Sequence, residues 1–514
     1  MRGKSDKKIV VTDTSQYEGR VRELRGVLGI RAIPLAALTV FLVFIGGFAF
    51  YTKLCVIDND IWWHLKVGDW IVEHLAVPHT GILSRTAASR PWVAYSWGYE
   101  VMLSRAYAWF GLLGIALYGL ALTIGVAVAL FWMLRRLSER FWAACLLTGI
   151  VCLAFLFNGM PRPVNFSQML YCVTLTLVLL ARRTGSAKLL YWLPLVFFFW
   201  ANLHIQFIYG LFALGLFVGV NLMQRVMRSF GQRSDFVSEP TLPLKPLLAV
   251  FAACVVATMV GPNLFHPYSV VLAYTKAKFP YSVIVELQPL TFTHYSHFLE
   301  LFIGAAGFYA LGWHRKLDPF KLALLAVASV VAYRTMRDAW FICLSAAACI
   351  ADSLRLQAAS ESEQDPVIGW RELTTVFAGI VLLLLMSAPV VDFSSRGLDR
   401  AISNDFPVNA INYFRRNPVP GPLYNNLNWG GFLMWYLPEL PVSIDGRNDL
   451  YGDKLDELFY NTQSAFPSYA TDPYLDEAGV VVLDSTLPLA KVLTIDPRFR
   501  LIYQDKVATV FARR

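Results

Sequence analysis

Long apolar runs recur through most of the chain, and they limit its fold more than any other feature. Runs such as 111–133, 208–223 and 298–313 approach the ~20 residues that a helix needs to cross a bilayer. Only 16% of the 514 residues are charged, whereas soluble chains average about 25%. We therefore predict a polytopic α-helical membrane protein with about eleven spans.

Lysine and arginine lie mainly in the short segments between these runs, which predicts the orientation of the chain. Residues 1–31 hold Arg20, Arg22, Arg25 and Arg31, so we expect a cytoplasmic N-terminal segment. The run 32–51 begins too late for a cleavable signal peptide and is expected to remain as the first span. The net charge of +9 is thereby assigned to orientation, and no nucleic-acid partner is expected.

This alternation of apolar runs and basic loops divides the chain into three parts. Residues 32–391 are predicted to form the transmembrane domain, in which 52–110 is a long first extracytoplasmic loop. Residues 392–514 contain no membrane-length run and are predicted to be a soluble extracytoplasmic α/β domain. Within it, 397–418 is expected to be helix and turn, and the β-branched segments 480–485 and 506–513 are expected to be strands.

Polar residues that interrupt the apolar pattern all fall on the predicted extracytoplasmic side. Such groups are costly near a bilayer and tend to mark function. Because sidedness was inferred from loop charge alone, their convergence is an independent signal. It predicts a site assembled from several segments, with these candidates: Asp58, Asp60, His64, Arg162, His204, Gln206, His266, Glu286, Arg334 and Arg337.

The first loop opens with two aspartates directly before an amphipathic helix. We expect this helix to lie along the membrane surface, with Trp62, Trp63 and Trp70 at headgroup depth. Either Asp58 or Asp60 can cap the helix, which leaves the other free to face a cavity. Asp-x-Asp spacing also suits a divalent cation held against a phosphate, so the sequence leaves a metal cofactor open. The 7 cysteines show no metal-binding spacing.

Three other loops carry candidate ligands, each with a plainer alternative. Arg334 and Arg337 form an outer pair that suits a phosphate, although Asp338 could serve as their partner. An apolar setting would raise the pKa of Glu286 and favour proton transfer, but it could equally be an ordinary loop acid. The alternating polar residues between 200 and 210 predict an extended re-entrant segment with one polar side, made of Asn202, His204 and Gln206, although these residues could equally cap the neighbouring helices.

Three stretches resemble the GT-C superfamily of polytopic glycosyltransferases, in particular glycosyltransferase-39-like membrane proteins. They are "DNDIWWHLKVGDWI" (58–71), "YNNLNWGGFLMWYLPELPVSIDGRNDLYG" (424–452) and "DPRFRLIYQDKVATVFAR" (496–513). The resemblance implies transfer of a sugar from a polyprenyl-phosphate donor, with a first-loop Asp as the base. Asp60 or Asp58 matches that acid, with Asp60 preferred because it adjoins the helix.

This chain departs from the resemblance in its span count, since many members of the superfamily have more than about eleven spans. His64, Arg334 and Arg337 are added from topology, as contacts for the donor phosphate. The turn-rich segment 445–452 is interpreted as structural. The partners expected are membrane lipid and the lipid-linked donor.

Two other classes of function fit the same pattern. A transporter or flippase for a lipid-linked or anionic substrate would also place polar residues on broken helices. A non-catalytic membrane assembly factor could use the Trp- and Gly-rich segment 428–438 as an interface. Covalent transfer of sugar separates an enzyme from both.

Overall fold

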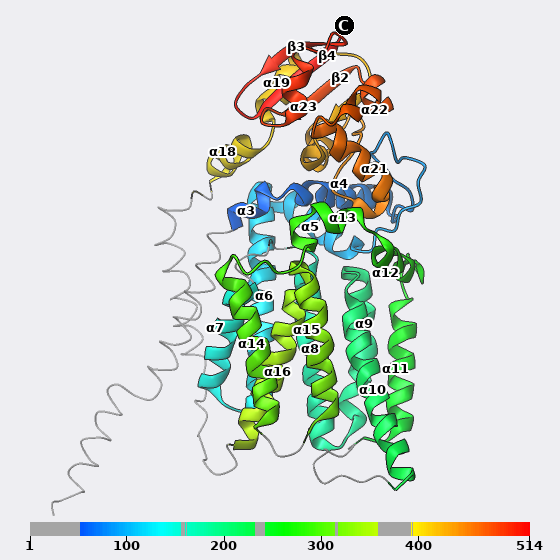
Figure 1. The fold of residues 1–514 in the computed structure, drawn as a ribbon, viewed down its shortest axis with the longest axis vertical. Coiled ribbons are helices and arrows are strands. Elements are labelled where there is room, and N and C mark those ends of the chain that lie inside the picture. Colours follow the sequence, from blue (N-terminus) through cyan, green and yellow to red (C-terminus); the bar gives the residue numbers. More distant parts are fainter. Residues whose placement is uncertain are drawn as a thin grey trace, which may run out of the picture.

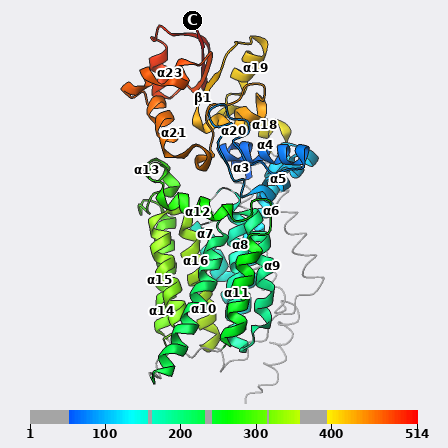
Figure 2. The same ribbon diagram turned by 90° about the vertical axis from the view of Figure 1, so that its right-hand side faces the viewer.

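The computed structural model describes residues 52–155, 160, 162–231, 242–313, 317–357, 392 and 394–514. The predicted first span 32–51 and the predicted last span 373–391 lie outside these residues. The described chain contains a helical bundle, a layer of short helices at one end of the bundle, and a C-terminal part with a small sheet (Figures 1 and 2).

The bundle consists of long helices that run side by side (Figure 1). They are α6 (Leu112–Ser138), α7 (Phe141–Phe155), α8 (Val164–Thr184), α9 (Leu193–Leu203), α10 (Phe207–Ser229), α11 (Leu244–Thr258), α14 (Tyr295–Gly312), α15 (Pro319–Arg334) and α16 (Ala339–Gln357). Among the described helices, α6, α8 and α10 are each long and apolar enough to cross a membrane. The protein is therefore an integral membrane protein that crosses the bilayer more than once.

The ends of the helices differ from those expected from hydropathy. The predicted span 168–180 is the middle of α8, which begins at Val164 and ends at Thr184. Its first turns include Asn165, Ser167 and Gln168, all of them buried. Backbone hydrogen bonds continue a helix through polar residues, so hydropathy underestimates its length.

A layer of short helices covers one end of the bundle (Figures 1 and 2). It contains α3 (Thr52–Ile57), α4 (Asn59–His74), α5 (Trp97–Phe110), α12 (His266–Lys276), α13 (Phe279–Val283) and the short turns η3 (Val285–Leu287) and η4 (Met336–Asp338). Every element that carries a predicted site residue ends in or beside this layer.

The indoles at the start of α4 are buried in protein, which corrects the prediction that they lie among lipid headgroups. Trp62 is fully buried, and its ring lies 6.0 Å from that of Phe406, 5.2 Å from that of Phe432 and 5.4 Å from that of Tyr436. Trp63 is also buried, while Trp70 is partly exposed. The apolar side of α4 thus packs against the C-terminal part, chiefly α20 (Gly430–Tyr436).

The C-terminal part contains a four-stranded sheet in the order β1-β2-β4-β3. Its strands are β1 (Leu423–Asn425), β2 (Val480–Asp484), β3 (Phe499–Gln504) and β4 (Ala508–Arg513). β1 pairs with β2 in parallel, and the other neighbouring pairs are antiparallel. The side chains of Val480, Val481, Val482 and Leu483 are all buried, so β2 is the core strand. Strands therefore occur where β-branched content predicted them.

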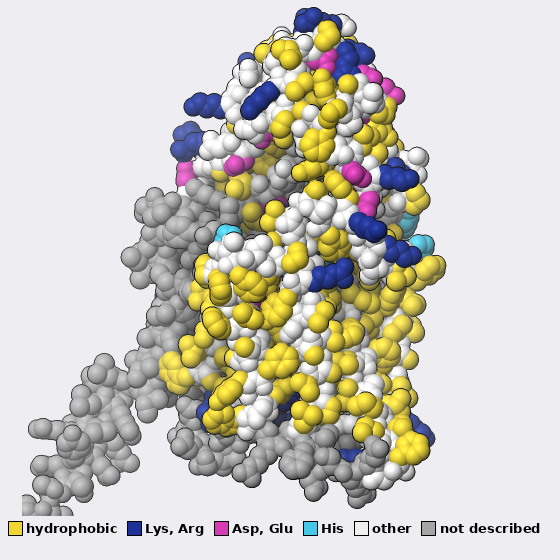
Figure 3. All heavy atoms as spheres, in the orientation of Figure 1, with side chains coloured by type: hydrophobic (Ala, Val, Ile, Leu, Met, Phe, Trp, Pro, Cys, Tyr) yellow, Lys and Arg dark blue, Asp and Glu magenta, His cyan; other side chains and the backbone are white. Residues whose placement is uncertain are grey.

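Helices surround this sheet and connect it to the layer below. They are α18 (Ser395–Asp405), α19 (Val408–Arg416), α21 (Asn448–Gln463), α22 (Pro473–Asp476) and α23 (Pro488–Leu493), with the turns η6 (Leu427–Trp429) and η7 (Pro467–Thr471). Figure 3 shows hydrophobic side chains over the bundle, while charged side chains gather over the C-terminal part and its junction with the bundle. This distribution suits a bundle in lipid and a C-terminal part in water.

Candidate functional site

Arg162 joins three carboxylates that come from distant segments. It lies just before α8, and its Nε and Nη2 donate to the two oxygens of Asp58, each at 2.8 Å. Its Nη1 lies 3.0 Å from Asp60 Oδ2 and 3.5 Å from the carboxylate of Glu286. A guanidinium fork suits this arrangement because it offers several donors in one plane. We call Asp58, Asp60, Arg162, Glu286 and Arg337 the arginine–carboxylate cluster.

Local structure fixes both sides of the Arg162–Asp58 pair. Asp58 is the N-cap of α4, and its Oδ1 accepts the backbone N–H of Asp60 at 3.1 Å. The side chain of Asn165, in the first turn of α8, accepts the backbone N–H of Arg162 at 2.9 Å. Of the two aspartates that the sequence offered as the cap of this helix, Asp58 is therefore the one that caps it.

Asp60 is the carboxylate of the pair that remains accessible. Its Oδ1 accepts a hydrogen bond from Trp63 Nε1 at 3.1 Å, one turn along α4. One quarter of the Asp60 side chain is exposed, compared with 2% for Asp58. Burial raises the pKa of Asp60, and the nearby Asp58 and Glu286 raise it further, although Arg162 acts to lower it. The carboxylate is accordingly a stronger proton acceptor than an ordinary aspartate.

Glu286 and Arg337 complete the cluster with a direct ion pair. Burial acts to raise the pKa of Glu286, but Arg337 and Arg162 outweigh it, so its pKa is lowered. Of the two settings that the sequence left open for Glu286, the apolar one does not apply, because two guanidinium groups face this carboxylate. The anionic partner of Arg337 is Glu286, while Asp338 instead accepts from Thr335 at 2.7 Å.

His64 lies beside the arginine–carboxylate cluster, but its hydrogen-bond partner, Glu100, is not part of the cluster. Its Nδ1 is 3.1 Å from Glu100 Oε1, and its ring stacks on Trp63 with 3.5 Å between centroids. Burial raises the pKa of Glu100 to about 8 and, with the charge of Arg162, lowers that of His64 well below its ordinary value. Both pKa shifts favour the uncharged forms of this pair, so a role of His64 as a cation for the donor phosphate stays a prediction that its surroundings do not favour.

The polar residues at the junction of α9 and α10 do not share one polar side, because each side chain contacts a different part of the protein. Asn202 accepts from Trp97 at 2.9 Å, His204 pairs with Ser167 at 2.7 Å, and Gln206 donates to Asp338 at 2.8 Å. They occupy a helix end and a short turn, so the predicted extended re-entrant segment was wrong. Gln206 nevertheless reaches the turn η4 that carries Arg337.

Two predicted site residues lie apart from the cluster. His266 is exposed at the start of α12, with its Nδ1 3.0 Å from the backbone oxygen of Asn263. Arg334 is exposed at the end of α15, with its guanidinium 5.7 Å from the ring centre of Tyr281. Neither has a contact with Arg162 or Asp60 among the interactions of the described residues.

The carboxylates do not assemble as ligands for a divalent cation. In the part of the chain that the structure describes, no group of three or more His, Cys, Asp or Glu side chains is placed to hold a metal. Both oxygens of Asp58 are engaged by Arg162. The two aspartates of the Asp-x-Asp motif, Asp58 and Asp60, both form ion pairs with the guanidinium of Arg162.

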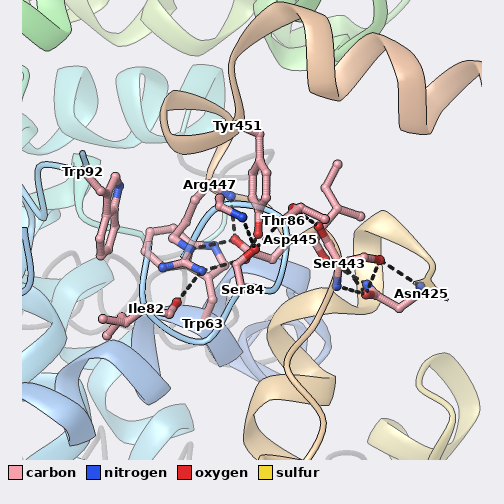
Figure 4. Close-up of polar contacts among 12 residues, drawn as sticks. Trp63, Ile82, Ser84, Thr86, Trp92, Asn425, Ser443, Asp445, Arg447 and Tyr451 are labelled. Carbon is pink, nitrogen blue, oxygen red and sulfur yellow. Dashed lines mark hydrogen bonds and ion pairs between the residues drawn. The ribbon is translucent and has the colours of Figure 1, made fainter. Parts of the chain in front are cut away.

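A turn of the C-terminal part, 445–447, reaches the cluster and was interpreted from sequence as only structural. Asp445 and Arg447 form a buried ion pair at 2.8 Å, drawn in Figure 4. Between them, Gly446 lies so close to Asp60 that an added Cβ would meet Asp60 Oδ1 at 2.2 Å. The sequence feature that could have indicated a functional role for this turn is the charged segment "DGRND" (445–449), which lies between apolar segments.

Exchange of Asp58 for asparagine should separate its structural role from catalysis. Asparagine caps a helix about as well as aspartate, but it cannot bind Arg162 through a charged fork. We expect the free energy of unfolding to fall by about 1–3 kcal/mol, because Arg162 loses the charged acceptor of its two 2.8 Å hydrogen bonds and keeps only Asp60 and Glu286 as counter-ions. The matched control is Asp69→Asn, on the same helix at 40% side-chain exposure. Thermal unfolding that is unchanged in Asp58→Asn would contradict this assignment.

Asp456 predicts a pH dependence of stability. Its two carboxylate oxygens are buried without a hydrogen-bond partner among the described residues. Burial, followed by repulsion from Asp445, Asp449 and Asp453, raises its pKa from 3.8 to about 8. The folded protein therefore keeps this proton up to about pH 8, whereas the unfolded chain loses it near pH 4, so stability declines as pH rises between these values.

Asp456→Asn should remove this decline and raise the free energy of unfolding at pH 8, and with it the melting temperature. A pKa shift from 3.8 to about 8 corresponds to several kcal/mol, at roughly 1.4 kcal/mol per pKa unit. Thermal unfolding between pH 5 and pH 9 measures it, with the exposed neighbour Glu457→Gln as the control. Equal pH profiles for Asp456→Asn and the unsubstituted protein would refute the prediction.

Comparisons with known proteins give little further guidance. No family model matches the sequence, and no curated protein does. One solved structure that resembles it is ArnT from Cupriavidus metallidurans bound to undecaprenyl phosphate, at 14% identity and a TM-score of 0.45. The match covers 92% of this chain and 97% of that chain. At these values the likeness establishes neither a shared fold nor a shared activity.

Proposed function

We propose that this protein is a GT-C-type membrane glycosyltransferase that moves a sugar from a polyprenyl-phosphate-linked donor to an extracytoplasmic acceptor. One observation carries the proposal. An accessible carboxylate with a raised pKa, Asp60, lies 3.0 Å from Arg162 at the end of a membrane bundle. A base and the guanidinium group that orients it thus occur together where a lipid-linked donor would present its sugar, and a second arginine, Arg337, belongs to the same cluster.

The reaction needs one bond broken and one formed. In the proposed step, Asp60 takes the proton of an acceptor hydroxyl, and the hydroxyl oxygen bonds to the anomeric carbon of the sugar. The bond from that carbon to the phosphate oxygen breaks, and the electron pair leaves with the phosphate. Arginine side chains stabilise the charge that develops there.

Arg337 is the cation best placed to receive the phosphate. Its partner Glu286 is partly exposed, at 40% of its side chain, so an incoming phosphate can displace it. Arg162, by contrast, is held by Asp58 through two hydrogen bonds and remains beside Asp60. We therefore assign Arg337 to the donor phosphate, and Arg162 to the orientation of Asp60.

The proposal is tested with protein reconstituted in liposomes that contain a polyprenyl-phosphate-linked labelled sugar. Label that becomes covalently attached to an acceptor in the presence of protein supports it. Label that crosses the bilayer while still on its lipid supports the transporter alternative and contradicts the proposal. Lipid extracted from the purified protein should also contain polyprenyl phosphate, which a non-catalytic assembly factor would not need to bind.

A further inference from the structure

We propose that the C-terminal turn Asp445–Arg447 is a positioning element that holds the carboxylate of Asp60 in its reactive orientation. The inference rests on the proposed role of Asp60 and extends it, because it makes the C-terminal part a component of the site. Gly446 and Arg447 are the residues through which the turn acts.

Gly446 is required by contact and not by backbone conformation. It is absent from the glycines with positive φ in the described chain, so its backbone suits any residue. A Cβ at this position would, however, meet Asp60 Oδ1 at 2.2 Å and Trp63 Nε1 at 3.2 Å. The backbone of Gly446 therefore packs directly against the hydrogen bond from Trp63 to Asp60.

The turn itself is held rigidly. Asp445 accepts from the backbone N–H of Arg447 at 3.0 Å, from its guanidinium at 2.8 Å twice, and from Tyr451 Oη at 2.5 Å (Figure 4). The guanidinium also donates to the backbone oxygen of Ile82 at 3.1 Å and lies 4.8 Å from the ring centre of Trp92. With both charged side chains fully buried, displacement of the turn is costly.

The first loop anchors the turn to the layer that contains Asp60. Thr86 Oγ1 donates to the backbone oxygen of Ser443 at 2.5 Å, and the backbone N–H of Arg85 donates to the backbone oxygen of Val442 at 2.8 Å. Val442 in turn donates its N–H to the oxygen of Leu83 at 3.2 Å. Segment 442–443, directly before the turn, is therefore hydrogen-bonded to the loop that follows α4, and Gly431 of α20 packs against the backbone of Trp63 in α4.

This arrangement fixes which oxygen of Asp60 reacts. Oδ1 is bound by Trp63 and covered by Gly446, while Oδ2 faces Arg162. A Cβ at position 446 would force the turn and the carboxylate apart, and the displaced carboxylate could then rotate about its Cβ–Cγ bond. Misplacement of a catalytic group by about 1 Å can cost on the order of 100-fold in rate.

The test is Gly446→Ala, with Gly219→Ala as the matched control, because nothing lies within 4 Å of a Cβ added at Gly219 in α10. We expect Gly446→Ala to lower kcat by on the order of tenfold to 100-fold, with KM for the donor nearly unchanged. Carbodiimide labelling of Asp60, measured by peptide mass spectrometry, should be faster in Gly446→Ala than in the control.

Labelling tests the positioning independently of the proposed reaction. If the unsubstituted protein transfers no sugar, the proposed function fails, but faster labelling still supports the positioning. If Gly446→Ala does not fold, Trp63→Phe decides, because it removes the indole N–H that holds Oδ1 and keeps an aromatic ring at this position. Unchanged labelling in the variant that folds overturns the inference, as does unchanged kcat in a protein that transfers sugar.

Discussion

Replacement of Arg162 by alanine is expected to abolish sugar transfer and to lower the apparent melting temperature by roughly 5 °C or more. Arg162 is the shared counter-ion of Asp58, Asp60 and Glu286. Without Arg162, the buried carboxylate of Asp58 loses the two hydrogen bonds that it accepts from the guanidinium. Removal of one partner from a buried ion pair costs about 3–5 kcal/mol.

Arg162→Lys separates charge from geometry in this prediction. Lysine keeps the positive charge but offers a single ammonium group in place of a planar fork. We expect a melting temperature between those of the unsubstituted protein and Arg162→Ala, with transfer still strongly reduced. Arg500→Ala, on the exposed face of β3, is the control. Melting of Arg162→Ala at the unsubstituted temperature would mean that the cluster contributes nothing to the fold.

The convergence of Asp58, Asp60, Arg162, Glu286 and Arg337 could be predicted from the sequence, but their pairing could not. Loop charge places polar segments on one side of a membrane without any knowledge of how helices pack. Which carboxylate meets which guanidinium depends on the arrangement of α4, α8, η3 and η4 around one another. For this reason the partners considered for Arg337 were a phosphate ligand and its neighbour Asp338, whereas its partner in the structure is Glu286.

The amphipathic pattern of α4 was predicted correctly, but its partner was not. Hydrophobic periodicity shows that one side of a helix is buried, and it does not distinguish lipid from protein. Trp62 packs against Phe406 and Phe432, which lie far along the chain. The contact of Gly446 with Asp60 was missed for the same reason, because Asp, Gly and Asn in a short segment indicate a turn wherever it packs.

Asp60→Asn is the second prediction with a large expected effect. Asparagine matches aspartate in size and can still accept from Trp63, so the fold should be retained. It cannot take a proton from an acceptor hydroxyl. General-base catalysis contributes about 10²–10⁴-fold to rate, and we expect kcat to fall by that factor. The melting temperature should change far less than in Arg162→Ala.

The most direct test of the account measures single-turnover transfer of labelled sugar from a polyprenyl-phosphate donor by reconstituted protein carrying Asp60→Asn. Asp69→Asn, on the same helix, and the unsubstituted protein are measured in parallel, together with donor binding. We expect Asp60→Asn to bind the donor but to transfer sugar at least about 100-fold more slowly, while Asp69→Asn is unaffected. Transfer by Asp60→Asn at the unsubstituted rate would contradict the role of Asp60 as the base.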